Sequence, residues 1–192
     1  ALPCVDLIDL GPIPDQPDLI AAALRRAAAE ADLIVTTGGV SVGDEDHTTR
    51  LVQAAGGTVH AMKLAMKPGK PLTLGTLGGA VWLGLPGNPV ASFVTWMVVG
   101  APVLRALAGL SAPVVAPQSA RLATAVRHKT GRCEYRPARR AGVDAGGLML
   151  VDCLADAGSH RVAQLACADG LALIPAEASD LAAGDRIAFL PF

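Results

Sequence analysis

Three glycine-rich junctions lie close together in this chain, and each borders a short apolar run that predicts a β-strand. They occupy Thr37–Asp46, Lys67–Pro71 and Leu85–Pro89. Strands that alternate with helices form a parallel, doubly wound sheet, in which ligands bind at the carboxyl ends of the strands. Bare backbone N–H groups at such turns, beside helix N-termini, suit an anion. The sequence therefore predicts an α/β fold with an anion site at one edge of a mostly parallel sheet.

Apolar periodicity and turn signals place the other elements of this first part. Helices are expected over residues 18–31, 44–55 and 88–107, the last with Asn88 as its N-cap and Pro89 at its first position. Strands are expected over residues 4–10, 33–37, 59–64, 72–76 and 81–85. No apolar run is expected to be long enough to cross a membrane, because Gly100 and Pro102 interrupt the longest one.

The pattern changes after Gly109. Residues 111–118 contain two prolines and predict a linker. Short runs separated by turn signals follow, with candidate strands at 119–127, 134–141, 147–154, 161–166, 171–174 and 186–190. This spacing indicates a small antiparallel β domain, either a sandwich or a barrel. We therefore divide the chain into a first domain over residues 1–110, the linker and a β domain over residues 119–192.

Composition excludes several classes of function. The chain is 52% hydrophobic and 17% charged with a net charge of −1, so no global basic field favours nucleic acid or a membrane. The four cysteines and four histidines show no metal-ligand spacing, which argues against a zinc site and for reduced thiols in the cytoplasm. The chain has neither a G-x-S-x-G motif nor a P-loop, which argues against a serine hydrolase and a Walker ATPase.

The first and third junctions offer backbone and side-chain groups for a ligand. Glycines allow a sharp turn and a close approach of the backbone, and Ser41 adds a hydroxyl donor. Carboxylates beside an anion site hold a divalent metal, accept a ligand hydroxyl or cap a helix, and for Asp44 capping and binding both remain open. The turn from Pro86 to Pro89 is both a capped helix start and a third wall of one pocket.

The middle junction carries the positive charge. Lys63 and Lys67 are an even number of residues apart, so an extended backbone would place them on one face. Lys70 follows a turn that Pro68 and Pro71 bracket, and it could fold back towards Lys67. Exposed, solvated lysines are the alternative, but the rigid turn beside glycine loops favours a site for a phosphate or another oxyanion.

Together and in this order, the junctions resemble those of the molybdopterin molybdenumtransferase family, the MoeA-type proteins and the gephyrin E domain. The matching segments are Thr36–Asp46, Lys63–Pro71 and Gly84–Pro89, and the resemblance covers essentially the whole chain. It implies a molybdopterin-binding fold followed by a small β-barrel domain. It also implies insertion of molybdate into adenylylated molybdopterin with release of AMP, a requirement for Mg²⁺, a homodimer of the full-length protein, and a molybdopterin adenylyltransferase as upstream partner.

The resemblance assigns roles residue by residue. The implied molybdate-binding residues are Lys67, Lys70, Arg132 and Ser159. The implied catalytic residues are Asp15, Asp46, Lys63 and Lys67, with Asp46 as the candidate magnesium ligand. The implied molybdopterin-binding residues are Gly38, Gly39, Ser41, Gly43, Asp44, Pro86, Gly87, Asn88 and Pro89.

The chain departs from the family's pattern at its start, because nothing before Ala1 supplies the family's first strand and T-G-D-E/S-type loop. We therefore expect these 192 residues alone to have little or no transferase activity and to expose a sheet edge that favours self-association. A molybdopterin adenylyltransferase is the first alternative, and the two-lysine turn and appended β domain disfavour it. A non-catalytic, gephyrin-like scaffold is the second, and the composition gives it no positive support.

Overall fold

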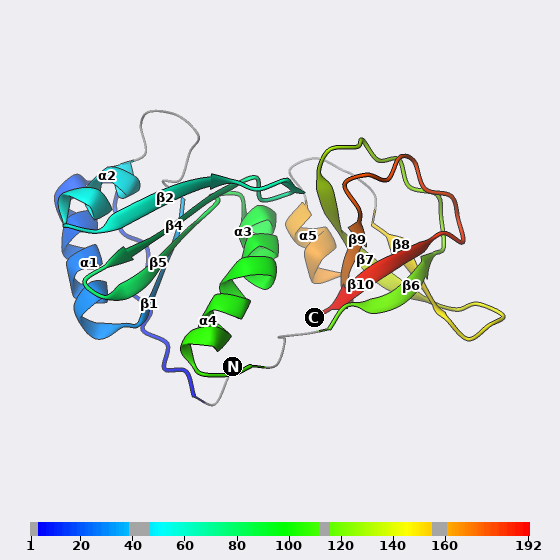
Figure 1. Ribbon diagram of the computed structural model, residues 1–192, viewed down its shortest axis with the longest axis horizontal. Helices are drawn as coiled ribbons and strands as arrows, with labels where there is room; N and C mark the ends of the chain where they lie inside the picture. Colours follow the sequence, from blue (N-terminus) through cyan, green and yellow to red (C-terminus); the bar gives the residue numbers. More distant parts are fainter. Residues whose placement is uncertain (1–3, 39–46, 112–115, 155–160) are drawn as a thin grey trace. The chain divides into compact units, whose positions relative to one another are not determined.

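The chain forms two compact units, each with its own hydrophobic core (Figure 1). The computed structural model describes residues 4–38, 47–111, 116–154 and 161–192. The first unit comprises Ala1–Leu64 and Gly69–Ala112, and the second comprises Ala65–Pro68 and Pro113–Phe192. The four residues Ala65–Pro68, which we call the strap, therefore leave the first unit and join the second. The predicted division, with a single boundary near residue 110, places these four residues in the first domain.

The first unit is built on a four-stranded sheet. Its strands, in spatial order, are β1 (Leu33–Thr37), β5 (Ala80–Leu85), β4 (Pro71–Leu77) and β2 (Thr58–Lys63). β1 and β5 are parallel, whereas β4 runs antiparallel to both β5 and β2. The α/β class is confirmed, but the described sheet is mixed rather than mostly parallel. The physical reason is that the links before and after β4 are too short for the helical crossover that parallel neighbours need.

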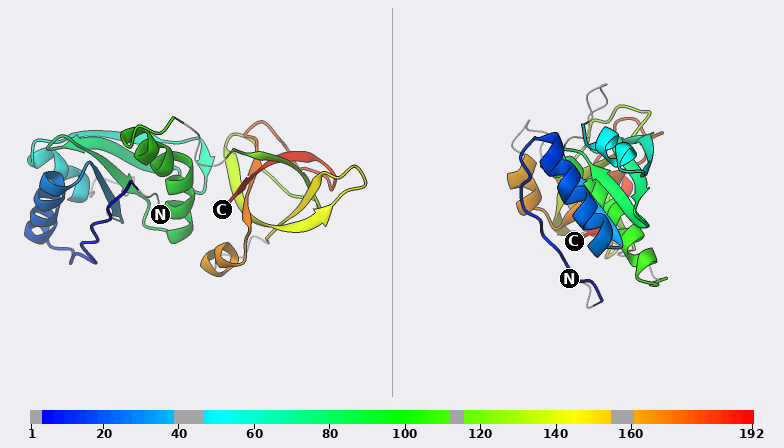
Figure 2. Two further views of the ribbon diagram at one scale, coloured as in Figure 1. Left: turned by 90° about the horizontal axis from the view of Figure 1, so that it is seen from below. Right: turned by 90° about the vertical axis from the view of Figure 1, so that its left-hand side faces the viewer.

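Helices cover both faces of this sheet (Figures 1 and 2). They are α1 (Pro17–Glu30) and α2 (His47–Ala54) on one face, and α3 (Pro89–Thr95), the π-helical turn η1 (Trp96–Gly100) and α4 (Ala101–Leu107) on the other. Alternation along β5 serves both layers: Trp82 packs in the cluster with α1 and α2, and Leu83 packs in the cluster with η1 and α4. The predicted helices over 18–31 and 88–107 are confirmed with small shifts at their ends.

The helix over Pro89–Leu107 contradicts one expectation. Its 19 residues, with a mean hydropathy of 1.7, are long and apolar enough to cross a membrane by length and composition alone. Core helices of soluble proteins pass the same test, and here Trp96, Val99 and Val103 pack against the sheet. Gly100, the last residue of the π turn, has no room for a side chain, because a β carbon there would overlap the Trp96 ring.

The predicted strand over residues 4–10 is wrong. The described part of this segment, from Cys4 onward, forms no strand, and Leu7 is 88% exposed. A strand needs a neighbour for its backbone hydrogen bonds. Residues 4–10 pair with no described strand. Among the described strands only β5 pairs with β1, so the other side of β1 has no strand neighbour, and Val35 on β1 is 41% exposed.

The second unit is a closed barrel with one short extra strand. Its strands, in spatial order, are β3 (Met66–Lys67), β7 (Cys133–Val143), β8 (Met149–Cys153), β6 (Gln118–Leu122), β10 (Arg186–Pro191) and β9 (Gly170–Ile174). Pairing of β7 with β9 closes the five strands β6–β10 into a ring (Figure 2). The predicted β-barrel is confirmed, although β6 and β8 are parallel.

The predicted strand over residues 161–166 is also wrong, because this segment forms the helix α5 (Arg161–Ala166). Alanine, leucine and glutamine dominate it, and these residues favour helix over strand. Phe189 and Ile174 are fully buried in the barrel core, which the ring closes without this segment.

Candidate functional site

The sheet of the first unit brings two of the glycine junctions and two lysines to one edge. Thr37, at the end of β1, pairs with Leu85 at the end of β5. Lys63, at the end of β2, pairs with Pro71 at the start of β4. Because β4 runs antiparallel to both β5 and β2, these two pairs lie at the same end of the strands. We call this end of the sheet, which crosses all four strands, the glycine edge. Three strand spacings of about 4.8 Å make it about 14 Å wide.

Two glycines of different junctions touch at this edge. Gly38 has a φ of +82°, a conformation that residues with a side chain rarely adopt. A β carbon on Gly87 would lie 3.4 Å from the Gly38 Cα atom. The backbones after β1 and β5 are therefore close together: a β carbon on Gly87 would make an ordinary contact with Gly38, whereas one on Gly38 would meet no atom within 4 Å.

The turn after β5 is a capped helix start. The Asn88 Oδ1 atom accepts a hydrogen bond of 3.1 Å from the Ala91 N–H, and the Ser92 hydroxyl donates to the Pro86 carbonyl. Pro86 is buried, whereas the three residues Gly87–Pro89 are exposed. The capping interpretation of Asn88 is thus confirmed, and the three residues Gly87–Pro89 are exposed at the glycine edge.

The three lysines of the middle junction divide between the two units. Lys63 and Lys70 are exposed in the first unit, where the Leu64 N–H donates a 2.8 Å hydrogen bond to the Lys70 carbonyl. This bond holds the two lysines at the same end of the β2–β4 pair. Lys67 belongs to the strap and hence to the second unit.

The strap is held on the barrel by backbone pairing. β3 runs parallel to the start of β7, with Met66 opposite Cys133 and Lys67 opposite Glu134. The Cys133 N–H donates a 2.8 Å hydrogen bond to the Ala65 carbonyl, and Met66 is buried. Lys67 is therefore placed by the barrel, directly before the cis peptide bond to Pro68.

Lys67 forms an ion pair with a buried carboxylate. Its Nζ atom lies 3.0 Å from Glu134 Oε1, and the Arg136 Nε atom lies 3.0 Å from the same oxygen. Arg136 Nη2 donates a 3.1 Å hydrogen bond to Glu134 Oε2, whereas Nε is buried without a well-aligned hydrogen bond. Burial by itself would raise the pKa of Glu134, but hydrogen bonds and charge from Arg136 and Lys67 outweigh it and lower that pKa below its ordinary 4.5.

A buried histidine fixes the loop that carries Arg132. The His128 ring places Nδ1 2.9 Å from the Ala178 carbonyl and Nε2 3.1 Å from the Arg132 carbonyl. Nε2 also lies 3.9 Å from Glu134 Oε2, and the ring is 2% exposed. The Arg132 side chain is exposed and has no hydrogen bond or ion pair within the described residues, so its guanidinium can contact a ligand.

The remaining predicted carboxylate of the described chain, Asp15, is exposed ahead of α1. A β carbon on Gly78, in the turn between β4 and β5, would lie 3.1 Å from the Ala28 β carbon, so the end of α1 lies at the sheet edge opposite the glycine edge. The start of α1, and Asp15 with it, therefore lies towards the glycine edge.

The other predicted positions lie outside the described residues: Gly39, Ser41, Gly43, Asp44, Asp46 and Ser159. Among the residues that the structure does describe, no group of three or more His, Cys, Asp or Glu side chains is placed to hold a metal. The magnesium site therefore remains a prediction.

Sequence reasoning missed Glu134, Arg136 and His128. Glu134 stands in the same Gly131–Tyr135 segment as Arg132, and residues 134 and 136 share one face of a strand because they are two apart. An acid and an arginine at that spacing were a usable signal for an ion pair. The partner on the strap was not visible in the sequence, since the β3–β7 pairing joins residues far apart along the chain.

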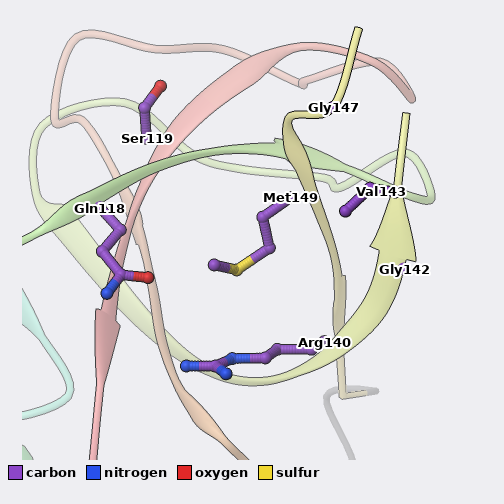
Figure 3. A pocket seen from close by; sticks show the side chains of 7 residues that line it. All are labelled: Gln118, Ser119, Arg140, Gly142, Val143, Gly147 and Met149. Carbon is purple, nitrogen blue, oxygen red and sulfur yellow. The ribbon is translucent and has the colours of Figure 1, made fainter. Parts of the chain in front are cut away.

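A separate hollow of about 600 Å³ lies on the barrel, towards the other end of β7 (Figure 3). Arg140, Gln118 and Met149 extend into it. It was not predicted, and it shares none of its lining residues with the strap or the glycine edge.

Two family models match the chain. Residues 3–106 match a "Probable molybdopterin binding domain", and residues 119–192 match the "MoeA C-terminal region (domain IV)". The chain is 31% identical over 188 residues to the molybdopterin molybdenumtransferase of Haemophilus influenzae, covering 97% of this chain and 46% of that protein. It is 39% identical over 104 residues to the molybdopterin molybdenumtransferase of Nostoc, covering 53% of this chain and 24% of that protein.

A solved structure shares the fold. The crystal structure of a molybdopterin biosynthesis MoeA protein from Pyrococcus horikoshii superposes with a TM-score of 0.75 and 25% identity, covering 92% of this chain and 41% of that one. The chain therefore spans less than half the length of these proteins.

Proposed function

Because the chain belongs to the MoeA-type family of molybdopterin molybdenumtransferases, we propose that it acts in insertion of molybdate into adenylylated molybdopterin, with release of AMP. The observation that carries this proposal is the convergence at the glycine edge of the Gly38 turn, the capped turn at Asn88, and the lysines 63 and 70. Backbone N–H groups, a helix N-terminus and two ammonium groups in one row suit a ligand with phosphate groups and a long polar body.

In this proposal the glycine edge binds molybdopterin. The near contact of Gly38 and Gly87 leaves backbone uncovered, so a ligand can approach N–H groups that a side chain would otherwise shield. Lys63 and Lys70 supply positive charge along the same edge. By strand spacing Lys63 is about 14 Å from Gly38, three strands away, whereas Lys70 is one strand, about 5 Å, from the Gly87 turn. This spread fits contacts with different parts of one extended ligand.

Molybdate, a tetrahedral dianion, would be bound by ammonium and guanidinium donors. An ammonium group has three N–H donors, and Glu134 takes one from Lys67, so two remain for oxyanion oxygens. Arg132 lies two residues before Glu134 in the same barrel segment, and its exposed guanidinium offers a planar pair of donors. The family resemblance adds Lys70 and Ser159 to the residues proposed to bind molybdate.

Three further parts of the proposal come from the resemblance. Magnesium, when bound, would stabilise charge on the phosphoanhydride that is cleaved, with Asp46 as a ligand and Asp15 near the same edge. The full-length protein would be a cytoplasmic homodimer, and a molybdopterin adenylyltransferase would supply the adenylylated substrate. Light scattering of the full-length protein tests the dimer.

The competing function is adenylylation of molybdopterin, and the co-substrate separates the two. The chain is incubated with molybdopterin and ATP, and separately with adenylylated molybdopterin and molybdate, while equilibrium dialysis and AMP chromatography follow each ligand. The proposal predicts binding of adenylylated molybdopterin and no molybdopterin-dependent consumption of ATP. Formation of adenylylated molybdopterin from ATP would overturn it in favour of the adenylyltransferase.

A further inference from the structure

We propose that Glu134 is a positioning residue for the oxyanion: its carboxylate holds the Lys67 ammonium in place on the barrel before the anion arrives. This rests on the proposed function, in which Lys67 binds molybdate. Glu134 is 5% exposed and its Oε1 atom lies 3.0 Å from Lys67 Nζ, so the pair joins a fixed, buried anchor to a half-exposed side chain.

The anchor is rigid because several elements converge on it. Arg136 holds the same carboxylate through Nε and Nη2, and it donates a second hydrogen bond from Nη2 to the Arg127 carbonyl. The His128 ring faces the other carboxylate oxygen at 3.9 Å. The strap backbone is fixed separately by its pairing with β7. Both ends of the flexible Lys67 side chain are thus held.

Positioning matters because a lysine stem has many rotamers, and an anion that binds a free lysine must order it. A lysine that is already held loses less freedom on binding. The charge also remains favourable: Lys67 and Arg136 carry two positive charges against one on Glu134, and the exposed Arg132 adds another.

If Glu134 positions Lys67, removing its charge changes the affinity for molybdate in the direction opposite to that expected from charge alone. Glu134→Gln removes a negative charge next to the anion site, so Coulomb attraction alone would tighten molybdate binding. If Glu134 positions Lys67, the same change weakens binding, because the ammonium is released from its anchor.

The test is calorimetric titration of the full chain with sodium molybdate at constant ionic strength. Glu134→Gln is expected to raise the Kd about 10-fold, by analogy with the lower end of the effects seen when a group that orients a metal-ligating residue is lost. Glu177→Gln is the matched control. Glu177 is exposed, its charge contributes to raising the pKa of Cys133, and it forms no ion pair with Lys67. The control should leave the Kd unchanged or lower it. A Glu134→Gln variant that binds molybdate as tightly as the unmodified chain, or more tightly, overturns the proposal.

Glu134→Gln leaves Arg136 buried without its counter-ion, which could unfold the barrel. The double variant Glu134→Gln with Arg136→Met removes both buried charges and still frees Lys67. It is expected to weaken molybdate binding as the single variant does, and unchanged binding contradicts the proposal equally.

A second readout does not depend on molybdate. The rate at which an amine-reactive ester labels Lys67, measured by mass spectrometry, should rise several-fold in both variants, whereas labelling of the exposed Lys63 and Lys70 stays constant. Equal labelling of Lys67 overturns the anchoring. Lys67→Met separates the two claims. If this variant binds molybdate as tightly as the unmodified chain does, or if the unmodified chain does not bind molybdate, the proposed function of Lys67 fails. If only Glu134 proves irrelevant, the positioning role alone fails.

Discussion

Gly87 lies against Gly38, with a hypothetical β carbon on Gly87 only 3.4 Å from the Gly38 Cα atom. The two glycines follow neighbouring parallel strands, and their near contact joins two loops that are almost fifty residues apart in the sequence. The close approach makes the glycine edge a continuous surface of backbone rather than two separate turns. It is also a place where the effect of adding a single carbon can be measured.

Gly38→Ala should destabilise the first unit by about 1–2 kcal/mol, because alanine is disfavoured at positive φ. Both tryptophans of the chain, Trp82 and Trp96, lie in this unit, so tryptophan fluorescence during urea unfolding reports on it selectively. Gly87→Ala is the matched control, since Gly87 has no positive φ and its added carbon makes only an ordinary contact. Its effect should stay below about 0.5 kcal/mol. Equal losses in the two variants would contradict the backbone explanation.

Asn88→Ala should destabilise the same unit by about 1 kcal/mol, because the Ala91 N–H loses the Oδ1 acceptor that caps the helix. Asn88→Asp keeps a side-chain oxygen at this position and adds a negative charge at the helix N-terminus, which is favourable. It should therefore retain full stability in the same fluorescence assay. A loss of stability in the aspartate variant as large as in the alanine variant would show that the cap is not what stabilises this turn.

The barrel should lose stability in acid through Glu134. Its pKa in the folded protein lies below the ordinary 4.5, so folding favours the ionised form. The stability contributed by this carboxylate is complete above about pH 4.5 and is lost as the pH falls towards the lower folded value. Urea titrations followed by NMR signals of β9, at neutral pH and at about pH 4, should show a smaller acid loss in Glu134→Gln than in the unmodified chain. Equal acid losses would mean that Glu134 does not titrate as its ion pairs require.

Cys153 should resist alkylation. Burial, the largest contribution, raises its pKa to about 11 from an ordinary value of 9.0, so at neutral pH about a hundredfold less thiolate is present. Cys167 is exposed and provides the control within the same chain. A time course with iodoacetamide, analysed by mass spectrometry, should modify Cys167 long before Cys153. Comparable rates at the two thiols would contradict the burial of Cys153.

Local patterns predicted most of the elements in the first unit, because each one is specified by its own residues. Asn88 and Pro89 mark a helix start, and the run over Leu33–Thr37 marks a strand that the structure confirms to the residue. The antiparallel course of β4 was missed because strand direction depends on connection length and pairing rather than on the strand's own residues. Residues 161–166 were misassigned because six residues carry too little periodicity to separate strand from helix.

The candidate site was predicted only where chemistry and turn signals coincide. The glycines and Asn88 can be identified by residue type as turn and cap residues, and the register of β1 and β5 then brings them together. The Lys67–Glu134 ion pair could not be predicted, since it requires the strap to pair with β7 across a long stretch of chain. The lysines of the middle junction read as one cluster in the sequence, whereas the structure assigns Lys67 to the barrel unit.

In the proposed function, the strap and the barrel present Lys67 to an oxyanion. Diffraction from crystals of the full chain grown with molybdate, with an anomalous difference map recorded at the molybdenum absorption edge, tests it most directly. We expect one molybdenum peak with an oxygen within about 3.2 Å of Lys67 Nζ, while Nζ keeps its contact with Glu134. A molybdate ion bound elsewhere, with Lys67 contacting Glu134 alone, would contradict it.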